Sequence, residues 1–301
     1  MSVIENAIKR LQGARATTAP GRDNAIDALA ATTPVRQLEA GAVLAAGRPL
    51  AINQDALRAA GLLPPPHQER ELAQQFRQIK RPLINRALGR GVAAVAHGNL
   101  LMVASAVAGE GKTFMSLNLA LSIRLEEDVT VLLVDGDVVN PRLSQVLGVH
   151  QEPGLLDLAK DPNLAIASLV MPTDVPGLVF LPAGRPDDKA TELLASGRMH
   201  QLVAQLASQD PARLVLFDSA PLLLTTESQA LAQVAGQILV VVRADKTPQQ
   251  VVLEAIDTIS EEKPVSLVLN QCVRQAHGYY YQYGGVYQSG AATPRDKADS
   301  T

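Results

Sequence analysis

A glycine-rich segment that follows an apolar run constrains this 301-residue chain more than any other feature. Residues 106–113 read A-V-A-G-E-G-K-T, directly after the apolar run Leu100–Ala104 and before a helical pattern. A phosphate chain needs exposed backbone N–H donors, a helix N-terminus and one long cation. Glycines permit the tight turn of amides, Lys112 can reach the terminal phosphates, and the Thr113 hydroxyl can bind Mg²⁺. The sequence therefore predicts a phosphate-binding loop, although Ala106 stands where a strict pattern has glycine.

Two further apolar runs end in aspartates. V-T-V-L-L-V-D-G-D ends in Asp135 and Asp137, and L-V-L-F-D-S-A-P carries Asp218. Residues two apart on an extended chain point to the same side, and two neighbouring carboxylates repel unless a cation or a transferable proton intervenes. An aspartate after a strand is an ordinary turn when it stands alone. Beside a phosphate loop, the three aspartates favour a magnesium-nucleotide site.

Apolar runs alternate with helical stretches along the centre of the chain. This alternation predicts an α/β fold of the P-loop NTPase type, with a mostly parallel sheet, helices on both faces and ligands at the carboxyl ends of the strands. The expected strands are Leu100–Ala104, Val129–Val134, Leu178–Pro182, Leu214–Phe217, Ile238–Val242 and Val265–Leu269. The expected helices include Thr113–Leu125, Arg198–Ser208 and Pro248–Ser260, the last with Thr247 as its N-cap.

The flanks of this pattern divide the chain into three parts. Residues 1–66 are expected to form an N-terminal helix followed by an Ala- and Pro-rich linker, residues 67–275 the P-loop domain, and residues 276–301 a flexible tail. A helix is expected over Glu69–Leu88, with a kink or an end at Pro82.

Composition excludes several classes of protein. The net charge is −3 and the basic residues are scattered, so a nucleic-acid partner is not expected. The single cysteine, Cys272, rules out an internal disulfide, indicates a reducing compartment and is expected to be a buried small side chain. The five histidines show no metal-ligand spacing. No apolar run is long enough to cross a bilayer, which favours a cytoplasmic protein.

The tyrosines are confined to one short segment. All five lie within nine residues of the expected tail, at Tyr279, Tyr280, Tyr281, Tyr283 and Tyr287. A hydrophobic core would spread them along the chain. A partner-binding tail is one interpretation; beside an ATP site, phosphate acceptors are the favoured one.

Together these features resemble the bacterial tyrosine kinase family, P-loop enzymes of the deviant Walker group. The resemblance covers about residues 69 to 287 and rests on S-A-V-A-G-E-G-K-T, V-D-G-D, L-F-D-S-A-P and the tyrosine cluster. M-S-V-I-E-N-A-I-K-R-L, F-R-Q-I-K-R-P-L and A-T-E-L-L-A-S resemble the subgroup found with exopolysaccharide and exosortase gene clusters.

The resemblance implies an ATP- and Mg²⁺-dependent tyrosine autokinase. Asp135 would accept the proton of the incoming hydroxyl, and Thr113, Asp137 and Asp218 would hold the metal. Which of Asp135 and Asp137 is the base and which is the ligand stays open. Nucleotide contacts are expected from Ala108, Gly109, Glu110, Gly111, Lys112, Thr113 and Phe114.

The family also implies partners. Members like this one resemble ring-forming homo-oligomers in which the tail of one subunit enters the site of the next, so that phosphorylation in trans regulates polysaccharide synthesis and export. A membrane polysaccharide co-polymerase would activate the kinase and recruit it to the inner face of the membrane, and a phosphotyrosine phosphatase would reverse the modification.

This sequence departs from the family pattern at two places. Val139 and Asn140 stand where arginines often follow the second aspartate. Gln74, Arg77 and Lys80 stand where the oligomerising helix often carries E-x-x-R-x-x-R.

Two other functions compete with the kinase. A partitioning or positioning ATPase of the same fold class would carry a lysine near the start of the phosphate loop, where Ser105, Ala106 and Val107 stand here. A non-catalytic ATP-binding subunit of a polysaccharide exporter would not need the complete set of lysine, threonine and aspartates.

Overall fold

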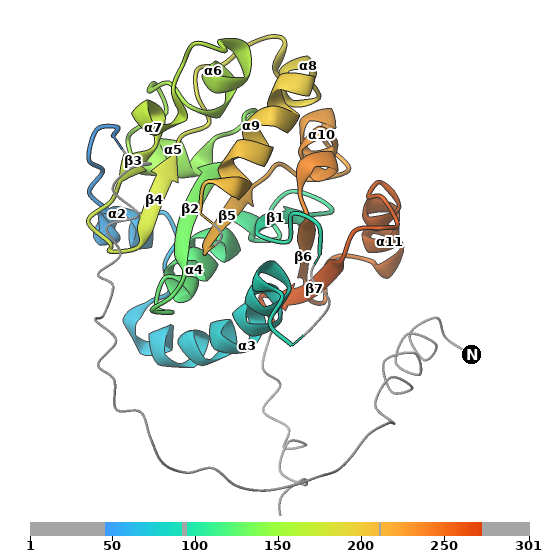
Figure 1. Cartoon of the computed structure of the whole chain (residues 1–301). Coiled ribbons are helices and arrows are strands. Elements are labelled where there is room, and N and C mark those ends of the chain that lie inside the picture. Colours follow the sequence, from blue (N-terminus) through green and yellow to red (C-terminus); the bar gives the residue numbers. More distant parts are fainter. Residues whose placement is uncertain (1–45, 92–94, 211, 273–301) are drawn as a thin grey trace, which may run out of the picture. The chain divides into compact units, whose positions relative to one another are not determined.

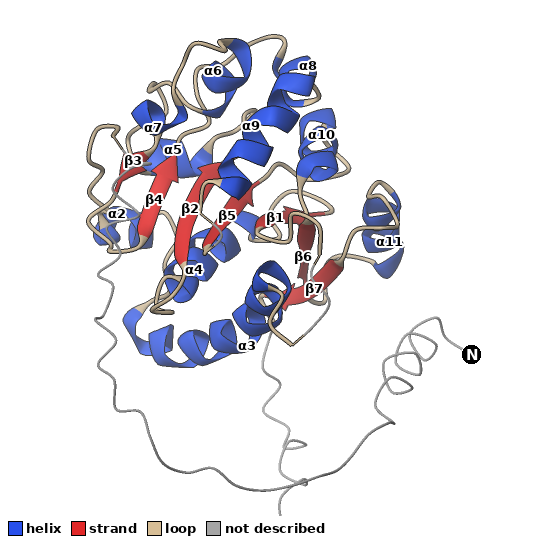
Figure 2. Cartoon of the chain, viewed as in Figure 1, coloured by secondary structure: helices blue, strands red, loops and turns tan. Residues whose placement is uncertain are grey.

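A seven-stranded, mostly parallel β-sheet organises the part of the chain that the computed structural model describes, residues 46–91, 95–210 and 212–272 (Figures 1 and 2). The strand order is β3-β4-β2-β5-β1-β6-β7, and in this sheet only the short β3 pairs antiparallel to its neighbour. The strands are β1 (Leu100–Ser105), β2 (Thr130–Asp135), β3 (Met171–Pro172), β4 (Leu178–Leu181), β5 (Arg213–Asp218), β6 (Gln237–Arg243) and β7 (Val265–Asn270). The α/β fold and the six expected strands are confirmed; β3, two residues long, had no signal in the sequence.

Helices cover both faces of the sheet, as Figure 2 shows. Alternate residues of one strand pack into different cores: Leu101 and Val103 of β1 face one hydrophobic cluster, and Leu100 and Met102 face the other. The first cluster takes side chains of α2 (Gln54–Ala59), α3 (Glu69–Leu88), α4 (Lys112–Ile123) and α5 (Arg142–Val146), and the short η3 (Pro66–Gln68) leads into α3. The second takes side chains of α6 (Leu155–Lys160), α7 (Ile166–Leu169), α8 (Ala190–Leu194), α9 (Gly197–Ser208), α10 (Thr226–Val234) and α11 (Gln249–Asp257).

Helix α3 continues through Pro82, so the expected end at that residue is wrong. The helix runs without interruption from Glu69 to Leu88 and stops at Gly89, whose φ of 63° is left-handed. Proline removes one backbone donor, which leaves the carbonyl of Gln78 without its helical partner. Both Pro82 and Gln78 are exposed, so water can take that carbonyl.

Helix α3 is fixed to α4 by an aromatic contact and by a buried cation. The rings of Phe76 and Phe114 lie 6.4 Å apart, centroid to centroid. Lys80 is 4% exposed; its Nζ donates to the carbonyl of Ser122 at 2.6 Å and lies 2.7 Å from Oε1 of Glu126. A positive charge at this point stabilises the C-terminal end of α4, where the free carbonyl groups carry partial negative charge. Lys80 therefore belongs to the interior of the domain.

Residues 46–66 pack onto the domain, whereas the sequence predicted a linker there. Leu57 and Leu62 are buried among side chains of α3 and α4. The amide of Asn118 in α4 donates to the carbonyl of Leu62 at 2.8 Å, and the backbone of Ile52 donates to Asp174 at 2.9 Å. The Ala- and Pro-rich composition predicted a linker because the few large apolar residues of this segment are widely spaced and form no regular pattern. The expected N-terminal helix and the tyrosine tail lie outside the described residues.

No helix in the described ranges combines the length and the apolar character that a membrane span requires.

We expect Leu57→Ala to lower the free energy of unfolding by about 2–5 kcal/mol, because the side chain is fully buried and its removal leaves a cavity. Urea denaturation of the full chain measures this loss. Leu125→Ala is the matched control, since Leu125 is 62% exposed and its loss should cost less than about 0.5 kcal/mol. Equal small effects of the two variants would mean that residues 46–66 do not pack on the core.

Candidate active site

The loop between β1 and α4 has the backbone of a phosphate cradle. Gly109 and Gly111 have φ angles of 81° and 94°, a region that side chains rarely tolerate. At Gly111 a Cβ atom would lie 2.1 Å from the side-chain nitrogen of Asn270. Glycine is therefore required at Gly111 both for its conformation and for the close approach of β7. Helix α4 begins at Lys112, so its free N–H groups open toward the loop.

Glu110 ties this loop to the neighbouring strand. Its side chain is 1% exposed. Oε2 accepts the backbone N–H of Val107 at 2.9 Å, while Oε1 accepts the N–H of Arg243 at 3.2 Å and the Thr247 hydroxyl at 2.5 Å. The carbonyl of Glu110 accepts Asn270 Nδ2 at 2.8 Å. The carboxylate is thus a structural clamp that shapes the loop from inside.

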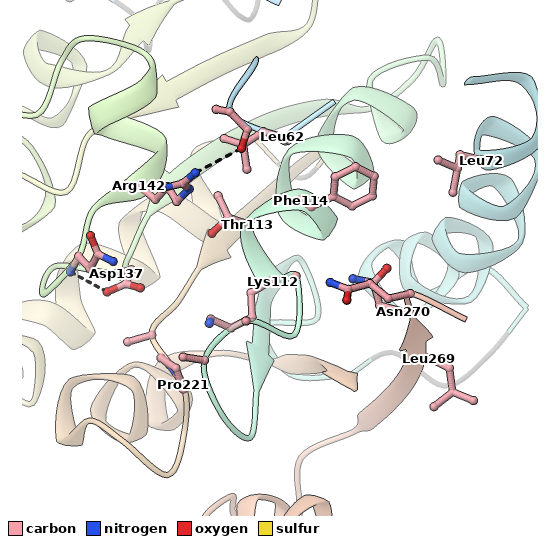
Figure 3. A pocket seen from close by; sticks show the side chains of 18 of the residues that line it. Leu62, Leu72, Lys112, Thr113, Phe114, Asp137, Arg142, Pro221, Leu269 and Asn270 are labelled. Atoms are coloured by element: carbon pink, nitrogen blue, oxygen red, sulfur yellow. Dashed lines mark hydrogen bonds between the residues drawn. The ribbon is translucent and has the colours of Figure 1, made fainter. Parts of the chain in front are cut away.

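A cavity of about 1440 Å³ opens over the loop (Figure 3). Pockets for small ligands usually measure about 300–1,000 Å³, so this one has room for a nucleotide and a second group. Asp137 and Asn270 lie on opposite sides of Lys112 in this view. The lining includes Ala108, Gly109, Gly111, Lys112, Thr113, Phe114, Asp137, Val139, Asn140, Arg142, Leu224, Leu269, Asn270, Gln271 and Cys272.

Lys112 supplies a nearly buried cation to this cavity. It is 8% exposed, and burial lowers its pKa, while the charges of Asp218 and Asp137 oppose that shift. A cation held in a poorly solvated place attracts phosphate more strongly than one in water.

Asp218 lies beneath the loop at the end of β5. It is fully buried; Oδ1 accepts the Ser116 hydroxyl at 2.9 Å, and Oδ2 has no hydrogen-bond partner among the described residues. Burial raises the pKa of Asp218 to about 6, although the Ser116 hydrogen bond acts in the opposite direction. A buried carboxylate oxygen without a donor is a position that a cation or an ordered water would satisfy.

The extended-chain argument predicted that Asp135 and Asp137 point to the same side, but only Asp137 lines the cavity. Asp135 is fully buried; its Oδ2 accepts the N–H and the hydroxyl of Ser144 at 2.8 and 2.7 Å, and it does not line the cavity. Burial raises its pKa well above the usual value, and the charge of Asp218 adds to the shift. Asp137 follows the end of β2 and lines the cavity, where the N–H of Asn140 donates to it at 2.9 Å. Burial raises the pKa of Asp137 as well.

The predicted nucleotide contacts gather at one place, with one exception. Ala108, Gly109, Gly111, Lys112, Thr113 and Phe114 line the cavity, whereas Glu110 faces the protein interior. Of the predicted metal ligands, Thr113 and Asp137 line the cavity and Asp218 lies below it. No group of three or more His, Cys, Asp or Glu side chains in the described ranges is placed to hold a metal unaided. Mg²⁺ usually takes one or two carboxylates together with substrate phosphates and water.

Several residues of the site escaped the sequence argument. Ser116 and Ser144 position Asp218 and Asp135, but a serine within a helix gives no distinct signal. Asn270 ends an apolar strand, a position that could have marked it as a site residue.

Thr247 was expected to cap α11, but Pro248 holds that position and the Thr247 hydroxyl donates to Glu110. Cys272 is exposed at the edge of the cavity, so the expectation of a buried cysteine is wrong.

We expect stability without nucleotide to fall as pH rises from about 4 to about 6.5, because Asp218 titrates near 6 when folded and near 3.8 when unfolded. Between these values the folded state binds more protons than the unfolded state, so the free energy of unfolding decreases as pH rises. Above them the whole loss of stability from ionising the buried Asp218 remains. Asp218→Asn removes this contribution. Urea denaturation at pH 4.5 and 7 should show a smaller decrease in the variant, and parallel curves would contradict the assignment.

We expect Glu110→Ala to lower the free energy of unfolding by about 1–3 kcal/mol, because it leaves the donors of Val107, Arg243 and Thr247 without an acceptor. Affinity for ADP should weaken about tenfold, equivalent to about 1.4 kcal/mol, since the loop loses its internal support. Denaturation and calorimetric titration measure the two effects. Glu127→Ala, at an exposed position after α4, should change neither, and a Glu110 variant that behaved like it would refute the clamp.

Known proteins with this architecture include tyrosine kinases. The tyrosine-protein kinase Wzc of Salmonella typhimurium is 31% identical over 200 residues, which cover 64% of this chain and 27% of Wzc. The tyrosine-protein kinase YwqD of Bacillus subtilis is 25% identical over 215 residues, covering 70% of this chain and 86% of YwqD. The crystal structure of the VpsO kinase domain superposes with a TM-score of 0.56 at 25% identity, over 69% of this chain and all of that domain.

The extent of these matches is limited to one domain. The chain spans about a quarter of the length of the first curated relatives it matches. No protein-family model matches the chain. The aligned region nevertheless agrees in sequence with one group of proteins and in fold with a kinase domain from that group. By both measures, the P-loop domain of this chain is similar to the domains of bacterial tyrosine-protein kinases.

Proposed function

We propose that this chain is an ATP-dependent protein-tyrosine kinase that phosphorylates tyrosines of its own C-terminal tail. The observation that carries the proposal is the open cavity where the phosphate loop, Lys112 and Asp137 meet. The cavity exceeds the size of a nucleotide site, which leaves space for an acceptor side chain beside the phosphates. The names of the aligned relatives support the same activity.

The loop and Lys112 bind the phosphate chain of ATP. The backbone of Gly109 and Gly111 and the start of α4 offer N–H donors, and Lys112 neutralises charge on the transferred group. Mg²⁺, when bound with the nucleotide, supplies further charge neutralisation. Thr113 and Asp137 are placed to hold it from the cavity, and the unpaired Oδ2 of Asp218 would hold it directly or through water.

One of the two aspartates at the end of β2 accepts the proton of the acceptor hydroxyl. Asp137 lines the cavity, so an acceptor hydroxyl can reach it in the conformation described. Asp135 is fully buried and held by Ser144, so it acts on the acceptor only if the segment between the two aspartates moves. The raised pKa of both carboxyl groups suits proton transfer, because a base works best with a pKa closer to neutral pH.

The acceptors in this proposal are Tyr279, Tyr280, Tyr281, Tyr283 and Tyr287, which lie outside the described residues. The reaction occurs in trans within a homo-oligomer. A membrane polysaccharide co-polymerase is the activator that brings the kinase to the inner face of the membrane, and a phosphotyrosine phosphatase completes the cycle that regulates exopolysaccharide synthesis and export. The family resemblance supports these partners.

We expect the full chain with Mg·ATP to accumulate phosphotyrosine between residues 279 and 287, and Lys112→Met to slow this by about 10²- to 10³-fold, because the transferred phosphoryl group loses its cation. Mass spectrometry locates the phosphate. Lys189→Met, which removes an exposed lysine outside the cavity, is the control and should keep the rate. Initial rates should rise more than linearly with protein concentration if transfer is in trans.

Two outcomes would contradict the proposal. ATP hydrolysis with unmodified tyrosines, even after addition of the membrane partner, would assign the chain to the nucleotide-switch ATPases. Nucleotide binding with neither hydrolysis nor transfer would indicate a regulatory subunit.

A further inference from the structure

Two large apolar side chains stand exposed at the edge of the cavity beside Asp137. Val139 is 60% exposed and Leu224 is 61% exposed, and both line the cavity. Burial of such side chains is favourable, so a rim that leaves two of them open to water is suited to an apolar group of a ligand.

The fold places these side chains on the acceptor side of the site. Val139 follows Asp137 by two residues after β2, and Leu224 lies in the segment between β5 and α10. Strands β2 and β5 are direct neighbours, so the segments that follow them leave the same edge of the sheet. Glu227, in the first turn of α10, is close enough for its charge to raise the pKa of Asp137. Both rim residues therefore flank the carboxylate to which an acceptor hydroxyl has access.

The nucleotide does not account for this rim. Its phosphates are assigned to the loop, and Asn270 and Leu269 line the cavity on the other side of Lys112 (Figure 3). The segment between Asp137 and Arg142 contains no lysine or arginine that would prefer an acidic peptide, and Arg142, which also lines the cavity, donates to the carbonyl of Ala60 at 3.2 Å. The chemistry of the rim is that of a subsite for an uncharged, apolar side chain.

The tail sequence offers such side chains next to its tyrosines. In G-Y-Y-Y-Q-Y-G-G-V-Y, residues 278–287, four of the five tyrosines have a tyrosine or a valine as an immediate neighbour. Tyr283 is the exception, because it lies between Gln282 and Gly284. The described chain ends at Cys272 on the cavity, and all five tyrosines follow within fifteen residues of it. The tail of a second copy is the occupant whose composition matches the rim.

We propose that Val139 and Leu224 form a specificity subsite that takes the apolar residue adjacent to the acceptor tyrosine in the tail of a second copy. This rests on the kinase activity proposed above and adds a preference among the acceptors. Tyrosines with an apolar neighbour are phosphorylated faster than Tyr283, because only their neighbour gains the contact. An apolar contact of this size discriminates between substrates by about tenfold.

Two full-length variants separate the enzyme from the substrate. The enzyme carries Tyr→Phe at all five tail positions, and the substrate chain carries Lys112→Met with its tail intact, so every transfer is in trans. Site-resolved mass spectrometry gives initial rates at Tyr287 and Tyr283 in one reaction. We expect Tyr287 to react about tenfold faster. The ratio of the two rates is insensitive to the overall activity of a variant.

Changes on both sides of the contact test its location. In the substrate, Gln282→Val should raise the rate at Tyr283, and Val286→Gln should lower that at Tyr287. In the enzyme, Val139→Asn and Leu224→Gln should bring the ratio close to one. Leu253→Gln is the matched enzyme control, because Leu253 is 44% exposed on α11 and does not line the cavity, and it should leave the ratio unchanged.

The outcomes separate this inference from the proposed function. Equal rates at Tyr283 and Tyr287, or a ratio unaffected by Val139→Asn and Leu224→Gln, would overturn the subsite while leaving the kinase intact. Absence of phosphotyrosine with the otherwise unaltered enzyme, even after addition of the membrane partner, would overturn the kinase itself, and the subsite with it.

Discussion

The parallel pairing of β5 with both β1 and β2 determines where the charged groups of this protein meet. In that register Asp218 lies opposite Asp135 on one side and Val103, two residues before the end of β1, on the other. Because the carboxyl ends of parallel strands lie at one edge of the sheet, the phosphate loop after β1 lies close to the two aspartates at the ends of β2 and β5. A shift of one residue in this pairing would turn each side chain toward the opposite face of the sheet, and the carboxylates would enter the core.

This convergence has an electrostatic cost that explains the local architecture. Glu110, Lys112, Asp135 and Asp218 are all less than a tenth exposed. Buried charges are tolerated when they are paired or hydrogen-bonded. Glu110 is satisfied by backbone and hydroxyl donors, whereas Asp135 and Asp218 each keep one oxygen that no donor in the described part of the chain reaches. One lysine does not balance three carboxylates, so a divalent cation bound together with the nucleotide would reduce the repulsion among them.

The sequence predicted the parts of the protein that have a strict pattern. Six strands, the phosphate loop and the aspartates after β2 and β5 follow from apolar runs that end in particular residues, and the structure agrees with them. Patterns could not predict contacts between distant segments. Leu57 sits in an Ala- and Pro-rich stretch yet belongs to the same buried hydrophobic cluster as side chains of α3 and α4. Lys80 stands in the region compared with the oligomerising helix, yet it is buried and donates to the carbonyl of Ser122 near the end of α4. The environment of Asp135 also depends on Ser144, whose N–H and hydroxyl both donate to one oxygen of this buried carboxyl group.

The site therefore has two halves with different physical demands. The inner half consists of buried groups whose positions are fixed by strand register and by hydrogen bonds to the backbone, and a change there disturbs folding as well as chemistry. The outer half, which includes Val139 and Leu224, lies on segments that follow the strands, where side chains are exposed and substitution costs little stability. The inner half can thus hold the phosphates in one geometry while the outer half changes to suit a different acceptor. Helix α3 shows the same separation between buried and exposed groups. Lys80 is bonded to the carbonyl of Ser122 and to the carboxylate of Glu126. A contact between copies through this helix therefore has to use the side chains that remain exposed, such as Arg77.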